Sequence, residues 1–142
     1  MTKMAPARTG DFGPLEVWEA YRRLETTMRL RPAMGAYLEI RKGRPCACGA
    51  GAVALATGYP GHLLLGDTPS SMDLRLHLGI SLAYLAGFIE GFDGDDPADS
   101  IWATQDMPTY LRGHAHGRAA AMLEGLIPLP LEDPAAAPEA VG

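Results

Sequence analysis

The stretch from Pro45 to Gly58 limits most strongly what this chain can fold into, because it has almost no side-chain bulk and no charge. Alanine favours helix, whereas each glycine inside a helix costs about 1 kcal/mol, so Gly49 and Gly51 need tertiary contacts to hold a helix together. Gly58 suits the left-handed backbone conformation that ends many helices. We therefore predict a buried central helix over residues 46–57, with the larger side chains of its neighbours packed around it.

The chain has 142 residues, a length that fits one domain with a single hydrophobic core. No apolar run approaches the roughly 20 residues that span a bilayer. The first residues lack the apolar segment of a secretory signal, which predicts a cytoplasmic protein. Cys46 and Cys48 are so close in sequence that a bond between them would close a strained ring, so we expect reduced thiols in a reducing compartment.

Apolar periodicity and end signals predict further helices before and after the central one. The first begins at Pro14 and ends by Arg31, because Pro32 disfavours helical geometry in the residue before it. Residues 72–78 alternate apolar and polar side chains, as a strand does. Helix is still favoured there, because Gly79 can end it and Ser81 can cap the helix that follows.

The last two helices are expected over residues 82–92 and from Pro108 to about Leu126, and one short extended pair near residues 36–47 has its turn at Lys42 and Gly43. The predicted fold is thus a mainly α-helical single domain, a bundle of about five helices around the small-residue helix. We assign residues 1–12 to a flexible arm, 13–126 to the helical domain and 127–142, rich in proline and alanine, to a flexible tail.

An internal repeat links the last two predicted helices. Residues 84–91 and 110–117 share the pattern Tyr-Leu-x-Gly-x-x-x-Gly with an offset of 26 residues. On a helix the tyrosine and both glycines lie on one side, so two such helices can approach backbone against backbone. We interpret the repeat as a helical hairpin, with coincidence in a glycine-rich chain as the alternative.

Two resemblances rest on short motifs. Cys-Ala-Cys-Gly-Ala from Cys46, together with residues 78–81 and 84–94, resembles small uncharacterised proteins of bacteria and their phages, over residues 46–94. Residues 83–118, with Ala-Tyr-x-x-Gly-x-x-x-Gly and a later Tyr-Leu-Arg-Gly, are weakly similar to ribosome modulation factor, a small helical protein that silences ribosomes. That family is strongly basic and this stretch is acidic, so the resemblance implies only the hairpin geometry.

Two thiols and two imidazoles offer a candidate metal site. Cys46, Cys48, His114 and His116 include the ligand types of a tetrahedral zinc centre. Structural zinc motifs usually space their ligands more widely, and residues two apart on a helix point to different sides. Buried thiols and surface histidines are therefore the favoured interpretation, and we expect no cofactor.

A nucleophilic cysteine is the second chemical possibility. Cys46 or Cys48 at the start of the central helix would meet the positive end of the helix dipole, which lowers a thiol pKa. His62 or His77 would act as the base. No Cys/His/Asn motif surrounds these residues, and buried cysteines are common in such helices.

Charge is unevenly distributed along the chain, whose net charge is −5. Residues 14–45 hold seven basic residues against four acids, a net of +3, and residues 62–107 hold eight acids against one arginine, a net of −7. We expect an electrically polarised molecule. The basic side chains assigned to partner binding are Arg22, Arg23, Arg29, Arg31, Arg41, Lys42 and Arg44.

The polarised charge, together with the lack of a catalytic motif, favours a small non-enzymatic interaction protein that binds and modulates a macromolecular partner of its host. Such a role is compatible with a phage origin. A protein partner is favoured over nucleic acid, because aromatic residues for base stacking are sparse in the basic segment and the whole chain is acidic. The alternatives are a cysteine-dependent enzyme that uses Cys46 or Cys48, and a ribosome-associated factor.

Overall fold

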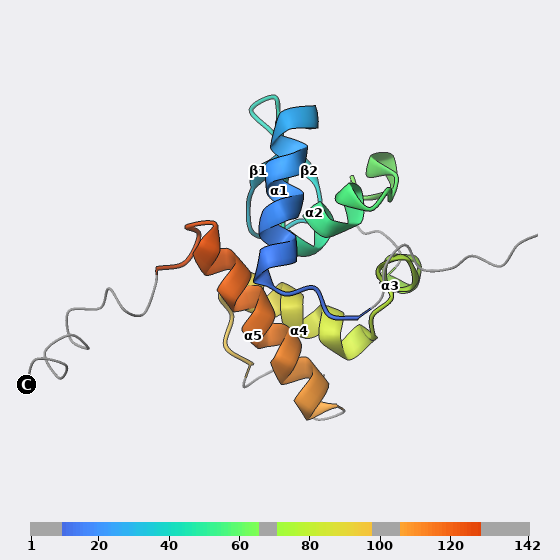
Figure 1. Ribbon diagram of the computed structural model, residues 1–142, viewed down its shortest axis with the longest axis vertical. Helices are drawn as coiled ribbons and strands as arrows, with labels where there is room; N and C mark the ends of the chain where they lie inside the picture. Colours follow the sequence, from blue (N-terminus) through green and yellow to red (C-terminus); the bar gives the residue numbers. More distant parts are fainter. Residues whose placement is uncertain (1–9, 66–70, 98–105, 129–142) are drawn as a thin grey trace, which may run out of the picture.

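The computed structural model of the chain describes residues 10–65, 71–97 and 106–128. Its elements in chain order are α1 (Pro14–Met28), β1 (Arg31–Pro32), β2 (Glu39–Arg41), β3 (Arg44–Ala47), α2 (Gly49–Ala56), the short 3-10 helix η1 (Gly61–Leu63), α3 (Ser71–Leu78), α4 (Leu82–Phe92) and α5 (Met107–Leu123). The helices and the small three-stranded sheet confirm the predicted mainly α-helical class (Figure 1). Residues 72–78 are helical, as their end signals predicted.

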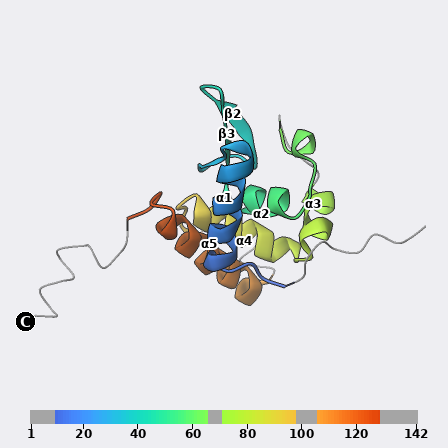
Figure 2. The same ribbon diagram turned by 45° about the horizontal axis from the view of Figure 1, so that its top comes forward.

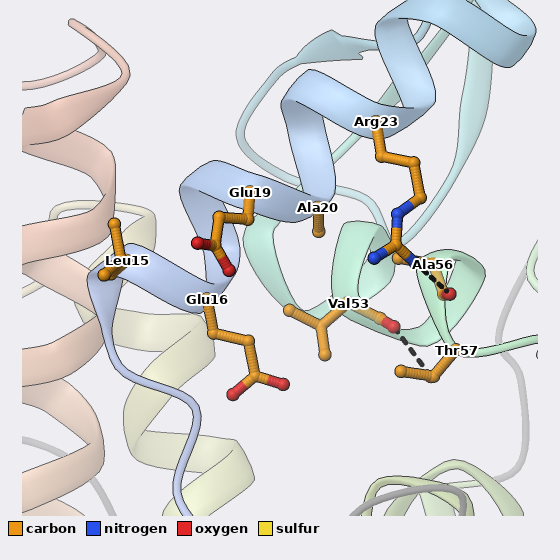
Figure 3. Close-up of a pocket in the computed structure, with 8 residues that line it drawn as sticks. All are labelled: Leu15, Glu16, Glu19, Ala20, Arg23, Val53, Ala56 and Thr57. Atoms are coloured by element: carbon orange, nitrogen blue, oxygen red, sulfur yellow. Dashed lines mark hydrogen bonds between the residues drawn. The ribbon is translucent and has the colours of Figure 1, made fainter.

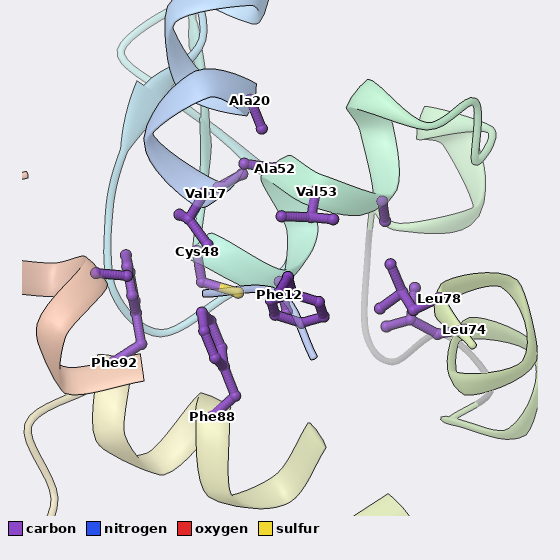
Figure 4. Packing of buried hydrophobic residues seen from close by; sticks show 14 of the residues in the cluster. Phe12, Val17, Ala20, Cys48, Ala52, Val53, Leu74, Leu78, Phe88 and Phe92 are labelled. Carbon is purple, nitrogen blue, oxygen red and sulfur yellow. The ribbon is translucent and has the colours of Figure 1, made fainter. Parts of the chain in front are cut away.

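Helix α2 is the predicted small-residue helix, and its residues from Gly49 to Ala54 are buried. Larger side chains pack directly on its backbone: a Cβ atom added at Gly49 would lie 2.9 Å from the ring of Phe88. Figure 4 shows Cys48 and Val53 in the same cluster as Phe12 and Phe88. The prediction of a slender buried helix with bulky neighbours is therefore confirmed for residues 49–56.

The predicted start of this helix at residue 46 is wrong. Cys46 and Ala47 belong to β3, and Cys48 is the extended residue that precedes the helix, with φ −76° and ψ 174°. The cause lies in the sheet, where Cys46 pairs with a residue on each side. These cross-strand contacts outweigh the helix propensity of the stretch.

The sheet has the strand order β1-β3-β2, with β1 parallel and β2 antiparallel to β3. Lys42 and Gly43 form the turn between β2 and β3 with φ of 50° and 77°. Positive φ at both residues is the geometry that two-residue hairpins favour. The predicted extended pair is confirmed, whereas β1 was not predicted, since it has only two residues and one of them is Pro32.

Helices α4 and α5 meet through glycines. Each of four glycines faces a carbonyl oxygen of the opposite helix so closely that an added Cβ atom would lie 2.1–2.3 Å from it. The pairs are Gly87 with Tyr110, Gly91 with His114, Gly113 with Tyr84, and Gly117 with Phe88. The repeat thus has the role that the sequence predicted, because it removes the side chains that would separate the two backbones.

The direction of this helix pair differs from the prediction. Residue numbers rise together along the contact: Gly87 meets Tyr110, and Gly91 meets His114 one turn later. The helices therefore run in the same general direction, whereas an αα-hairpin is antiparallel. Of the residues between the two helices, 93–106, the structure describes the first five and Asp106.

The described ends of the chain pack on this helical framework. Phe12 is fully buried, and the hydroxyl of Tyr84 donates a hydrogen bond to its carbonyl oxygen at 3.2 Å. Asp11 pairs with Arg112 of α5. The predicted flexible arm over residues 1–12 is therefore wrong for its last two residues. Residues 1–9 and most of the predicted tail lie outside the described residues.

Replacing Gly117 with alanine tests the close approach of α4 and α5. Helix propensity alone would stabilise Gly117→Ala by about 1 kcal/mol. The added Cβ atom would instead overlap the Phe88 carbonyl oxygen, so we expect the free energy of unfolding to fall by about 2 kcal/mol or more in urea titrations. Gly13→Ala is the control, because Gly13 has φ −74° and no atom within 4 Å of the added carbon. A Gly117→Ala protein as stable as the unmodified chain contradicts the contact.

Candidate functional site

Five basic side chains gather at one end of the molecule, which we call the cationic end. They come from the residue that ends α1, from β1 and from the β2–β3 hairpin, and they are Arg29, Arg31, Arg41, Lys42 and Arg44. Figures 1 and 2 show the last turn of α1 and the β2–β3 turn at the same end of the molecule, away from α4 and α5.

The sheet sets the spacing of the arginines. Arg41 lies directly opposite Arg44 in the ladder, and neighbouring strands are about 4.8 Å apart. On the other side of β3, Nη2 of Arg44 donates to the carbonyl oxygen of Arg29 at 3.4 Å. Arg29 has φ 61°, the left-handed conformation that ends α1 and turns the chain into β1. Three arginines thus lie side by side across the end of the sheet.

Most of this positive charge is not neutralised within the described residues. Arg41 pairs with Glu39. The described ranges contain no ion pair from the other four basic side chains, Arg29, Arg31, Lys42 and Arg44. Nε of Arg44 is buried and lacks a hydrogen-bond partner there. The five cations and Glu39 together carry a net charge of +4.

Two of the seven predicted binding residues lie elsewhere and bond within the molecule. Nη2 of Arg22 donates to Oε1 of Glu124 at 2.7 Å, and its guanidinium lies 5.0 Å from the ring centre of Trp18. Arg23 donates to the carbonyl oxygen of Ala56 at 3.2 Å. We therefore assign Arg22 to the packing of α1 against the end of α5, and we restrict the candidate site to the cationic end.

The carboxyl group of Glu124 makes the role of Arg22 measurable. Burial raises the pKa of Glu124, while the hydrogen bond and charge of Arg22 lower it. An acid whose pKa is raised on folding destabilises the native state once it ionises, so its cost appears as the pH rises and disappears as it is protonated. Arg22 reduces that cost.

Replacing Arg22 with alanine should therefore destabilise the protein at neutral pH. We expect Arg22→Ala to lose about 1–2 kcal/mol near pH 7, because it leaves Glu124 buried without its cation, and to lose less near pH 4. Chemical denaturation at both pH values measures the difference. Arg23→Ala is the control, because Arg23 is exposed and makes a single hydrogen bond to a carbonyl oxygen. A deficit equal at both pH values contradicts the assignment.

Both cysteines are buried and reduced, but only Cys48 meets the helix. Burial raises the pKa of Cys48 to about 11, although the backbone N–H groups at the start of α2 lower it. Desolvation therefore outweighs the helix dipole here. Cys46 lies two residues before Cys48, in β3, where its thiol points toward the Arg44 carbonyl oxygen at 3.7 Å. Neither thiol is arranged as an activated nucleophile.

The histidines proposed as bases lie at the other end of α2. Nε2 of His77 is 2.9 Å from the hydroxyl of Thr57, which follows the last residue of the helix. Thr57 follows Cys48 by nine residues, which corresponds to about 13 Å along a helix that rises about 1.5 Å per residue. His62 is exposed in η1, beyond Thr57 in the chain. The proposed cysteine and histidine pairs are therefore not assembled.

The contact of Thr57 with His77 was not predicted. The hydroxyl of Thr57 donates to the Val53 carbonyl oxygen at 2.8 Å and lies 2.9 Å from Nε2 of His77. Burial lowers the pKa of His77, which favours the neutral imidazole. The contact joins α3 to the end of α2.

The structure does not assemble the candidate zinc ligands. Nε2 of His114 is 2.7 Å from the Asp95 carbonyl oxygen, and Nδ1 of His116 is 2.6 Å from the hydroxyl of Tyr84. Both cysteines lie in or beside the sheet. Among the described residues no three His, Cys, Asp or Glu side chains are placed to share a metal ion.

A groove of about 460 Å³ lies between α1 and α2 (Figure 3). Its lining combines apolar and charged side chains: Leu15, Glu16, Glu19, Ala20, Arg23, Val53, Ala56 and Thr57. Figure 3 shows two carboxylates from α1 beside the aliphatic Val53 side chain, and Arg23 directed to the end of α2. The lining includes no cysteine or histidine, and its one hydroxyl group is that of Thr57.

Comparisons with protein-family models, with curated proteins and with solved structures found no match for the chain. The resemblances to phage proteins and to ribosome modulation factor therefore stay predictions. Among the described helices, none has the length and apolar character needed to cross a membrane.

Thiol labelling tests the state of Cys48. With a pKa of about 11, only about one thiol in ten thousand is ionised at pH 7, and burial blocks access to it. We expect iodoacetamide at neutral pH to label the folded protein far more slowly than the protein in guanidinium, as followed by mass spectrometry. The Cys46→Ala protein isolates the signal of Cys48. Fast labelling of the folded protein near pH 6 would instead reveal an activated thiol.

Proposed function

We propose that the chain is a non-enzymatic interaction protein whose cationic end binds an acidic surface of a protein partner in the cytoplasm. The observation that supports it is the set of four basic side chains that have no ion-pair partner within the described residues. They come from three separate elements and face one end of the molecule. A partner with opposite charge would be attracted and oriented by this field.

The small free energy of a single surface ion pair favours a partner that contacts several of these charges together. One exposed ion pair contributes about 0–1 kcal/mol, so a single basic residue specifies little. Arg41 stands opposite Arg44 in the sheet, Arg44 contacts the backbone of Arg29 at the end of α1, and part of Arg44 is already desolvated. A host macromolecular machine with an acidic face is the class of partner that the resemblance to phage proteins supports.

The alternatives have weaker support. A cysteine-dependent enzyme needs a reactive thiol, and the pKa of Cys48 is raised by burial. A ribosome-associated factor would rest on residues 83–118, but the described basic side chains that lack ion pairs at the cationic end lie outside that segment. Nucleic-acid phosphates also attract arginines, so binding to them is measured as a separate outcome below.

Affinity capture from the organism that encodes the chain tests the proposal. We expect the unmodified chain to retain one stoichiometric protein partner, and Arg31→Glu/Lys42→Glu to lose it. The matched control is Arg23→Glu/Arg118→Glu, which makes the same change in net charge at exposed positions away from the cationic end and should keep the partner. Salt should weaken the interaction.

Three results contradict the proposed function. In the first, Arg31→Glu/Lys42→Glu retains the partner as well as the control does. In the second, the only stoichiometric material retained is nucleic acid. The third is catalytic turnover that Cys46→Ala or Cys48→Ala abolishes. Circular dichroism is the control for folding of both charge variants. If both are folded, loss of the partner is caused by the changed surface charge.

A further inference from the structure

The outer edge of β2 carries a backbone position that has no partner within the described residues. Ile40 stands opposite Pro45, which has no N–H, so this is the pair of the antiparallel ladder that exchanges no hydrogen bonds. The N–H and C=O of Ile40 therefore point away from β3. Within residues 10–65, 71–97 and 106–128, no hydrogen bond takes up either group.

The two edges of the sheet differ in how open they are. At the other edge, β1 contains Pro32, which offers no N–H to a further strand, and it has only two residues. In β2 the central residue is Ile40, a strand former whose side chain is 56% exposed. An additional strand is thus accommodated at the edge of β2 and not at the edge of β1.

The positive charge beside the edge of β2 determines which kind of additional strand can bind there. Arg41 ends β2, Lys42 follows it in the turn, and Arg44 lies across the hairpin. A second copy of the chain would place its own cationic end, with its net charge of +4, against this one. An acidic segment would neutralise the same charge, so electrostatics favours an acidic partner over self-association.

We propose that the edge of β2 binds an extended acidic segment of the partner protein as a fourth strand, centred on Ile40. The backbone of the segment pairs with the open N–H and C=O, and its acidic side chains meet Lys42 and the neighbouring arginines. This is β-strand addition, in which main-chain bonds give affinity and side chains give selectivity. The proposal rests on the proposed function and specifies how the cationic end holds its partner.

A synthetic peptide of alternating valine and glutamate provides the probe. We expect it to bind the full chain in fluorescence anisotropy at low salt, and to slow hydrogen exchange of the Ile40 amide in NMR spectra. Methylating one central backbone nitrogen of the peptide should weaken binding about tenfold, since it removes a main-chain donor without changing charge. Lys42→Glu should weaken binding by a similar factor, and Arg118→Glu should not.

Variants at Ile40 give an independent readout on the protein. Ile40→Pro removes the outward N–H at an edge position that tolerates proline, and should weaken peptide binding. Ile40→Thr keeps the N–H and the strand propensity, and should bind as the unmodified chain does. Because the methylated peptide tests the same pairing on the unmodified protein, a poorly folded Ile40→Pro variant does not obscure the result.

Several outcomes overturn strand addition. The peptide fails to bind, or it binds with no protection of Ile40 and no effect of methylation. A second is a dimer in sedimentation experiments that dissociates when Ile40 is replaced by proline. A third is single-stranded DNA that displaces the peptide and slows hydrogen exchange of the Ile40 amide. If affinity capture still depends on Arg31 and Lys42 in these cases, the proposed function stands and only the mode of binding is wrong.

Discussion

Direct contact between the backbones of α4 and α5 is the constraint on which the rest of the structure depends. Four glycines remove every side chain that would hold the helices apart, and each lies under a carbonyl oxygen of the opposite helix. This contact fixes Phe88 and Phe92 of α4, whose rings pack on Gly49 at the start of α2. Phe12 completes the group with its ring centre 4.6 Å from that of Phe88.

The position of α2 in turn places the cationic end. Its first residues continue directly from β3, and the hydroxyl of Tyr21 in α1 donates to the Ala47 carbonyl oxygen at 2.6 Å in a buried site. Helix α1 and the hairpin are thereby held together, so that Arg29 and Arg44 meet at the far end of both. Packing among small residues organises the interior, and the uncompensated charge lies at the edge of the small sheet.

This arrangement supports the proposed interaction role over the cysteine-dependent alternative. A thiol packed among alanines and phenylalanines is desolvated, which raises the pKa of Cys48 even though it precedes a helix. Nδ1 of His116 is bonded to the hydroxyl of Tyr84 and Nε2 of His114 to the Asp95 carbonyl oxygen, so neither imidazole is placed beside a cysteine. Basic residues on strands and turns keep their charge exposed, where a partner can reach them.

The sequence predicted those features whose cause is local. The spacing of Gly113 and Gly117 after a tyrosine indicated a close helix contact, and Lys42 with Gly43 indicated the turn. Direction and pairing depend on distant residues, so they were missed: nothing near Cys46 shows that Arg31 pairs with it. The same holds for Arg22, whose partner Glu124 is 102 residues away. The sequence predicted the basic residues as one group, and their division into structural and exposed members required the fold.

Nuclear Overhauser contacts between the glycine α-protons of α4 and α5 test the central claim most directly. Backbone contact in the observed direction predicts strong contacts from Gly87 to Tyr110 and from Gly91 to His114. Contacts that instead link Gly91 to Tyr110 and Gly87 to His114 or beyond would show an antiparallel pair. Their complete absence would show that the two backbones do not touch, and either result would remove the framework that positions α2 and the cationic end.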